Sequence, residues 1–429
     1  MTTSGEGSRP VGPLQLLALG VNGIVGVGIF FIPATVAASA PGRGAVAVFA
    51  LVGLALLPAA LTFATLGRRF DEDGGPVVFA RAAFGDRVSF VVGWGAYVSA
   101  LFSAAAVVVG LTRATLPALG IAGGLAARVA PAVLVTLLAA VVASGLRLSA
   151  RVWTGLTVLK LLPLVLLVGA FALAWGRFPA PAPAAPDAGW LRAALVAVFA
   201  CQGFEIVPVI AGQVRASSRA VPFATVGSLL LAMALYLALV LACVTALPAL
   251  ASSAAPLADA AFVMSGSGLA RLVAAGTSVS ALGIAFGMMV TSPRYLSALA
   301  SGERELFALD RVAANGVPMR ALGITWLVVA AIVSLGELGE LFALSSIAVL
   351  MQFGTSALAL LVLAARRERG LRPGQSWPAI PTLAVAAALV VSGATVREGL
   401  GAAVAVVLGI VLLCVARPRP RGGEPPPQT

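Results

Sequence analysis

The chain has 429 residues, of which 60% are hydrophobic and 10% are charged, and its formal net charge is +12. A soluble domain carries about 25% charged residues, so this composition excludes an ordinary soluble protein. The positive charge does not indicate nucleic-acid binding, because the arginines are distributed as membrane topology requires.

Apolar segments long enough to cross a bilayer as helices recur along the whole chain. They predict an all-α polytopic membrane protein with about twelve transmembrane helices, embedded in the lipid bilayer. The segments cover residues 12–39, 44–66, 88–111, 130–147, 151–175, 190–212, 222–247, 269–299, 320–336, 339–364, 378–396 and 399–416.

The first and sixth segments contain residues that interrupt helices. Asn22–Phe30 holds three glycines and precedes Pro33, and Phe199–Pro208 combines Gly203 with a proline. Glycine is a poor helix former and proline removes a helix hydrogen bond. Backbone freed at membrane depth must face protein or a water-filled cavity. Both spans are therefore predicted to be broken helices, although glycines that only permit close helix packing are the alternative.

Two breaks that lie five spans apart are what an inverted repeat predicts. We expect a first five-helix repeat over residues 12–175 and a second over 190–364. Helices 11 and 12 over 378–416 are then peripheral. Residues 1–11 form a cytoplasmic tail, and the proline-rich residues 417–429 are expected to be a disordered cytoplasmic tail.

Free amides at a half-helix N-terminus favour a carboxylate, and free carbonyls favour an ammonium group. The two breaks therefore predict a site for a small zwitterion. Its expected residues are Ile24, Gly26, Val27, Gly28, Phe199, Cys201, Gln202 and Gly203.

Lys160 is the single lysine of the chain and lies mid-way along an apolar segment. A buried lysine can lose its proton near neutral pH, which arginine cannot. Its ammonium group can donate to carbonyls around Gly23–Val25 of span one and to a span-eight hydroxyl, Ser278 or Ser280. Losing the proton would loosen span one against span eight, so Lys160 is predicted to couple transport to protons. Snorkelling or a structural ion pair is the alternative.

Glu205 is the clearest acid inside a span. It is either a proton carrier, the partner of a cation, or a structural residue that accepts backbone hydrogen bonds within the broken helix. Span three contains no acid between Val88 and Thr112, so a cationic side chain or a polyamine lacks an obvious partner there. The sequence thus favours neutral amino acids.

Several motifs occur in the order that one transporter family shows. They are Gly26-Val27-Gly28-Ile29-Phe30, Asp73-Gly74-Gly75-Pro76, Ala83-Phe84-Gly85-Asp86, Gly93-Trp94, Gly203-Phe204-Glu205 and Arg219-Ala220-Val221-Pro222. Over residues 12–364 the chain resembles the amino acid–polyamine–organocation permeases. The resemblance implies a LeuT-like fold, ten core helices with two peripheral ones, an aromatic lid at Phe199, and a span-five lysine like that of some proton-coupled members. Val27 replaces the family's serine, which bears on substrate range.

The predicted function is secondary active transport of an amino acid, with the proton as coupling ion, across the cytoplasmic (plasma) membrane. An amino acid or amine exchanger and a non-transporting amino acid sensor are the alternatives. We expect no enzyme activity, cofactor, metal or nucleic-acid partner, since the chain lacks histidine and a metal-ligand cluster. Most arginines face the cytoplasm if both termini do, so the positive-inside rule predicts that orientation. The sequence does not predict an oligomeric state.

Overall fold

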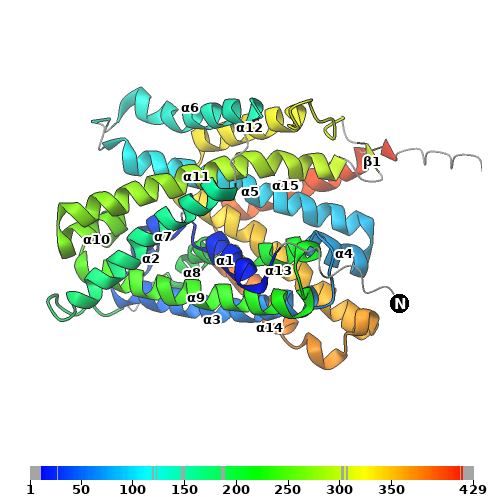
Figure 1. Cartoon of the computed structure of the whole chain (residues 1–429), viewed down its shortest axis with the longest axis horizontal. Coiled ribbons are helices and arrows are strands. Elements are labelled where there is room, and N and C mark those ends of the chain that lie inside the picture. The colour runs from blue at the N-terminus through cyan, green and yellow to red at the C-terminus, as the bar shows by residue number, and fades with distance from the viewer. Residues whose placement is uncertain are drawn as a thin grey trace, which may run out of the picture.

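The computed structural model describes residues 11–26, 28–117, 120–121, 123–145, 150–184, 189–300, 304–305, 308–415 and 417–418. Most of these residues lie in helices that run side by side, and the protein is an all-α polytopic membrane protein (Figure 1). Within these ranges the strands are β1 (Arg304–Glu305) and β2 (Arg417–Pro418), which pair antiparallel.

Nine helices of the described chain are long and apolar enough to cross a membrane. Two of the nine combine an α-helix with a short 3-10 helix. The nine are α3 (Arg43–Gly67), α5 (Asp86–Thr115), α6 (Gly124–Ala143), α8 (Trp190–Cys201) with η3 (Phe204–Gln213), α9 (Ser217–Ala246), α11 (Ser267–Ala300), α13 (Leu338–Ala365), η6 (Pro373–Ser376) with α14 (Ala379–Gly393), and α15 (Val396–Val415).

A tenth span is formed if α1 (Pro13–Ile24) and α2 (Gly28–Ser39) are taken together, with a bend of 43° between them. Each of the twelve predicted segments coincides with a helix, and the remaining two are α7 (Ala150–Leu173) and α12 (Met319–Leu335). The number of twelve membrane-crossing helices stays a prediction, as does the inverted repeat.

Two short helices were not predicted from the sequence. They are α4 (Pro76–Phe84) and α10 (Pro256–Ser265). Each begins at a proline, whose fixed φ suits the first helical position. Each ends at a glycine with positive φ, Gly85 at 84° and Gly266 at 77°, a conformation that glycine adopts without steric strain. The remaining short elements are η4 (Leu250–Ser252) and η5 (Glu368–Gly370).

The helices pack closely, and α1, which contacts α9 and η3, lies between α9 and α11 in Figure 1. Small residues allow this approach: a side chain on Gly20 would overlap Ser228 of α9, and one on Gly276 of α11 would lie 2.7 Å from Pro163 of α7. Such small residues let helix backbones come together in a membrane, where no hydrophobic effect drives them.

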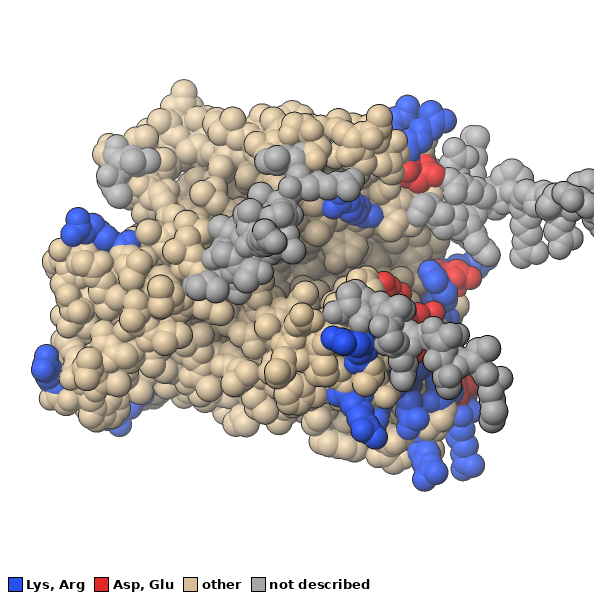
Figure 2. Space-filling view, viewed as in Figure 1, with Lys and Arg blue, Asp and Glu red and all other residues tan. Residues whose placement is uncertain are grey.

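The two ends of the helix bundle differ in charge. Acidic and basic side chains gather at the end near α4 and β1, and fewer lie at the opposite end (Figure 2). At the charged end Arg369 contacts Glu72 at 3.1 Å and lies over the Phe70 ring. Asp73 accepts hydrogen bonds from the backbone of Gly212 and the side chain of Gln213. It thereby joins the loop before α4 to the end of η3.

Candidate functional site

The first span is interrupted between Ile24 and Gly28. The helical φ/ψ pattern is lost at Val25, whose ψ is 72°, and the Gly26 amide bonds to the Ile24 carbonyl at 2.6 Å. Val27, a predicted site residue, lies outside the described residues. The break frees the last carbonyls of α1 and the first amides of α2 from intrahelical bonds, as the sequence predicted.

The sixth span is interrupted just after Cys201. Gln202 is extended and Gly203 has a φ of 128°, which glycine adopts far more readily than residues with a side chain. The chain then continues as the 3-10 helix η3. Glu205 Oε2 accepts a hydrogen bond from the Gly203 amide at 2.7 Å. In this arrangement Glu205 holds the broken backbone, which is the structural role considered for it.

The two breaks touch each other directly. A side chain on Gly203 would lie 2.6 Å from the Gly23 carbonyl carbon, and one on Gly28 would lie 2.7 Å from the Ala200 Cα. Overlap at these distances requires the backbone to move. The glycines therefore interrupt the helices and also permit their close packing. The two interpretations of the sequence, a broken helix and close helix packing, both describe the structure.

Two buried side chains bond to the carbonyls that the first break exposes. Lys160 of α7 is 5% exposed, and its Nζ donates to the Asn22 carbonyl oxygen at 2.9 Å. This acceptor lies one residue before the range predicted from the sequence. Tyr236 of α9, which the sequence analysis did not single out, donates from its hydroxyl to the Ile24 carbonyl at 2.7 Å.

The span-eight serines do not bond to Lys160 in this conformation. Ser278 donates to the Ala274 carbonyl of its own helix at 3.0 Å. Ser280 is buried, and its hydroxyl has no hydrogen-bond partner among the described residues. Span eight does reach the break, because a side chain on Gly26 would lie 3.3 Å from the Ile284 side chain.

A polar cluster lies next to the sixth-span break. Gln202 Nε2 donates to the hydroxyls of Ser103 on α5 and Ser345 on α13, at 3.2 and 3.3 Å. The two hydroxyls are 2.7 Å apart. Gln202 Oε1 is buried and has no partner within the described chain. The cluster therefore retains one unused acceptor beside the predicted site.

Two further predicted residues line the same end of α8. Phe199 is buried and packs on Phe342 of α13, with ring centroids 4.7 Å apart. Cys201 is fully buried, and its Sγ lies 3.6 Å from the sulfur of Met233. Cys201 and Phe199 thus join the end of α8 to α9 and α13, respectively.

A cavity of about 760 Å³ opens at the charged end, between α4, α5 and α11. Arg81, Asp86 and Tyr295 are among its lining residues. A second cavity, of about 400 Å³, lies between α2, α10 and α11 and is lined in part by Phe30 and Ser278. Among the described residues no three His, Cys, Asp or Glu side chains gather closely enough to hold a metal ion.

The arrangement offers a small molecule both signs of partial charge without a metal. The first amides of α2 form a positive helix terminus, and the last carbonyls of α8 form a negative one. The partners that sequence reasoning missed are Tyr236, Ser103, Ser345 and Phe342. Each lies in an apolar helix that also carries other hydroxyl or aromatic residues, a pattern that does not separate a site residue from ordinary packing.

Comparison with known proteins gives consistent matches. A family model described as amino acid permease matches residues 11–426. An uncharacterised transporter of Mycobacterium tuberculosis is 29% identical over 94% of this chain and 89% of its own length. The serine/threonine exchanger of Bacillus subtilis is 26% identical over 95% of this chain and 96% of its own. The arginine/ornithine antiporter of Pseudomonas aeruginosa is 30% identical, with coverage of 75% and 70%.

Proposed function

Because the chain belongs to the amino acid permease family, we propose that it carries neutral amino acids across the cytoplasmic membrane together with protons. The family is one of membrane transporters, and the long apolar helices make this chain an integral membrane protein. The proposal places the substrate at the touching breaks of the first and sixth spans.

Backbone groups at the breaks support recognition of a zwitterion. The amides that begin α2 near Gly28 are suited to a carboxylate, and the carbonyls that end α8 near Cys201 are suited to an ammonium group. Neither contact needs a charged side chain. Ile24, Gly26 and Gly203 remain part of this proposal because they lie at the same two breaks, and Val27 remains part of it as a prediction from the sequence.

Two observations support a neutral substrate. Glu205, the acid nearest the break, already accepts the Gly203 amide, and α5 carries no acid between Val88 and Thr112. The cluster of Gln202 with Ser103 and Ser345 is polar but uncharged, and its free Gln202 Oε1 suits a hydroxyl or amide donor on the substrate. An unpaired cationic side chain would cost at least about 2.5–3.5 kcal/mol at membrane depth.

The contact between Lys160 and Asn22 carries the proposal of proton coupling. A protonated Lys160 donates a charge-assisted hydrogen bond that holds α1 against α7. Among the described residues no carboxylate lies within ion-pair distance of Lys160, and its Nζ donates to the backbone carbonyl of Asn22. Loss of the proton would weaken this bond, free the end of α1, and link proton release to movement of the first span.

Purified protein in liposomes tests this coupling through two substitutions at one position. Lys160→Met removes both the proton and the bond, and Lys160→Arg keeps a permanent charge that can still bond to Asn22. We expect neither variant to accumulate labelled amino acid in response to an inward proton gradient. We expect Lys160→Arg to retain substrate binding. Wild-type accumulation by Lys160→Met would overturn the coupling role of Lys160.

Exchange of one amino acid for another is the second candidate function. It is favoured by two of the relatives, one named an exchanger and the other an antiporter. Liposomes loaded with labelled substrate separate the two candidates. An exchanger releases label only when unlabelled substrate is present outside, whereas a symporter also accumulates substrate into empty liposomes. If the protein is an exchanger, Lys160→Arg should transport normally, because the positive charge at this position then has only a structural role.

A further inference from the structure

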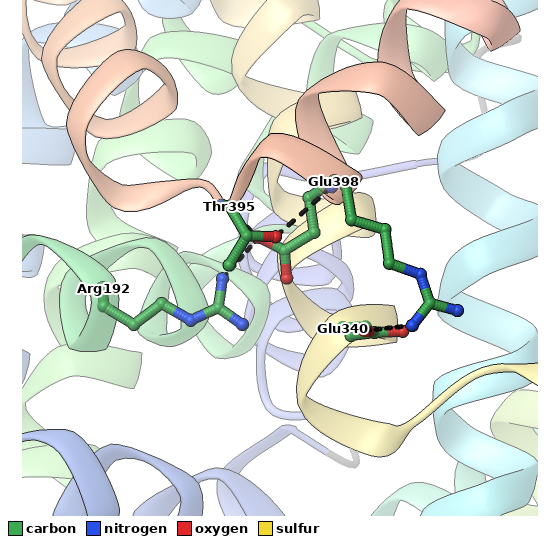
Figure 3. Close-up of polar contacts among 5 residues, drawn as sticks. Arg192, Glu340, Thr395 and Glu398 are labelled. Atoms are coloured by element: carbon green, nitrogen blue, oxygen red, sulfur yellow. Dashed lines mark hydrogen bonds and ion pairs between the residues drawn. The ribbon is translucent and has the colours of Figure 1, made fainter.

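A buried ion pair joins the sixth span to the carboxyl-terminal helices, at the end of the bundle opposite the charged end. Arg192 of α8 donates to Glu398 of α15, with 2.6 Å between Nη1 and Oε2 (Figure 3). The Glu398 side chain is 1% exposed and that of Arg192 is 28% exposed. Removing either partner would leave an uncompensated charge in a largely buried place.

Local helix stability does not explain Arg192. It occupies the third position of α8, which begins at Trp190. A positive charge in the first turn of a helix opposes the helix macrodipole and is unfavourable there. The reason for an arginine at this position is therefore its contact outside the helix, and that contact is Glu398.

Glu398, by contrast, has a local role of its own. The Thr395 amide donates to Glu398 Oε2 at 2.8 Å, and the Glu398 amide donates to the Thr395 hydroxyl at 3.3 Å. These reciprocal bonds form a capping box at the start of α15. The same Oε2 atom also accepts Arg192, so one oxygen connects the cap of α15 to α8. Glu398 Oε1 has no partner among the described residues.

Close packing supports the same connection. A side chain on Gly393, the last residue of α14, would lie 2.6 Å from the Leu191 carbonyl oxygen of α8. The first turn of α8 is thus held by the end of α14 and the start of α15 together. Ten residues separate Arg192 from the break at Gln202, which corresponds to about 15 Å along the helix.

We propose that Arg192 and Glu398 are positioning residues that fix the amino-terminal end of α8. Through that rigid helix they hold Phe199 against Phe342 beside the break. The proposal rests on the proposed function in one respect, namely that the carboxyl-terminal end of α8, at the break, borders the substrate. The carboxyl-terminal helices then contribute to the site without touching the substrate.

The adjacent residue on α15 supplies a matched control. Arg397 contacts Glu340 of α13 at 3.0 Å, but its side chain is 73% exposed and that of Glu340 is 26% exposed (Figure 3). Solvent-exposed ion pairs contribute little to stability. Arg397→Gln therefore removes an ion pair from the same helical turn without releasing α8.

Cys201 provides a reporter that does not depend on transport. It is fully buried at the end of α8, and replacing Cys243 and Cys414 with alanine leaves it as the single thiol. The measurement is the rate at which a membrane-impermeant maleimide labels Cys201 in reconstituted protein. We expect Glu398→Gln to raise this rate about tenfold, since glutamine keeps the capping box but removes the charge. Thr395→Ala and Arg397→Gln should leave the rate unchanged.

The double variant Arg192→Met/Glu398→Gln separates positioning from simple charge imbalance. If the pair positions α8, Cys201 should still be labelled fast in the double variant and the KM for uptake should rise, because the bond between positions 192 and 398 is still missing. Labelling at the wild-type rate in the double variant would overturn the proposal, as would an equal increase in Thr395→Ala. Arg192→Gln replaces Glu398→Gln if the latter cannot be purified.

The outcomes for the pair and for the proposed function are distinguishable. Faster labelling of Cys201 without measurable amino acid uptake by the wild type would support the positioning role and overturn the proposed transport. Normal uptake by the wild type, with an unchanged labelling rate of Cys201 in Glu398→Gln, would support the proposed transport and overturn the positioning role.

Discussion

At the scale of single residues, buried side chains take over the bonds that the helix breaks remove. Lys160 and Tyr236 donate to carbonyls at the end of α1, and Glu205 accepts the Gly203 amide. An unpaired backbone group at membrane depth is costly, since no water reaches it. The partners come from neighbouring helices at the first break and from the broken span itself at the second.

Tyr236→Phe tests how far the first break depends on such a partner. The substitution leaves the Ile24 carbonyl without its bond, which costs about 1–3 kcal/mol for a buried group. We expect a lower melting temperature and a KM for the transported amino acid raised about tenfold. Melting curves and uptake kinetics of the purified protein measure both.

Tyr97→Phe is the control for that prediction. The Tyr97 hydroxyl is also buried, and it lies 3.1 Å from the hydroxyl of Thr325, away from the breaks. We expect it to lower the melting temperature and to leave KM unchanged. An equal rise of KM in both variants would show that Tyr236 acts only through overall stability.

Sequence alone singled out the residues whose chemistry is rare in a membrane span. Lys160 and Glu205 stand out because ionisable groups inside spans are uncommon. Tyr236, Ser103 and Ser345 do not, because hydroxyl side chains occur throughout apolar helices and bond to their own backbone. Arg192 and Glu398 were missed because each lies near a span end, where charge is ordinary.

At the scale of elements, glycine decides where two helices can touch. Gly203→Ala places a methyl group 2.6 Å from the Gly23 carbonyl carbon and forces a residue with a side chain to a φ of 128°. Such strained backbone costs about 1–3 kcal/mol, and the overlap adds to it. We expect transport to be lost and the melting temperature to fall.

Gly323→Ala is the matched control on another helix. Gly323 lies in α12, and a side chain there would meet nothing within 4 Å. Alanine in a helix interior is favoured over glycine by about 0.5–1 kcal/mol, so this variant should be as stable as the wild type or more so. Loss of transport in Gly323→Ala would show that the assay reports general damage.

The positions of the breaks could be predicted from the sequence, but their mutual contact could not. Glycine and proline mark where a helix is interrupted, whereas the meeting of Gly23 with Gly203 depends on how distant spans pack. The short helices α4 and α10 were missed for a related reason: they are too short to be recognised as spans, and only their flanking proline and glycine mark them.

At the scale of the whole molecule, the unequal charge of the two ends predicts its orientation. The charged end carries the arginine-rich run from Arg366 to Arg372. The short helix η4 follows the carboxyl-terminal end of α9, at the opposite end of the bundle. In a protein whose native cysteines are replaced by alanine, Ala251→Cys should react with an impermeant reagent in intact cells. Glu368→Cys should react only after the membrane is opened, and the reverse pattern would contradict cytoplasmic termini.

Hydropathy located the long apolar helices because crossing a bilayer requires such helices. The five-plus-five relation between the halves stays a prediction, and it is harder to obtain from residues. Such symmetry relates the backbone paths of the two halves and leaves their side chains free to differ.

The contact of Gly23 with Gly203 also has a consequence for the membrane as a barrier. Because the two interrupted spans are packed together at their breaks, neither span can move without displacing the other. Under the proposed function the substrate passes these breaks, and ions that leak through the protein between turnovers take the same route. The close packing of Gly23 against Gly203 then limits that leakage.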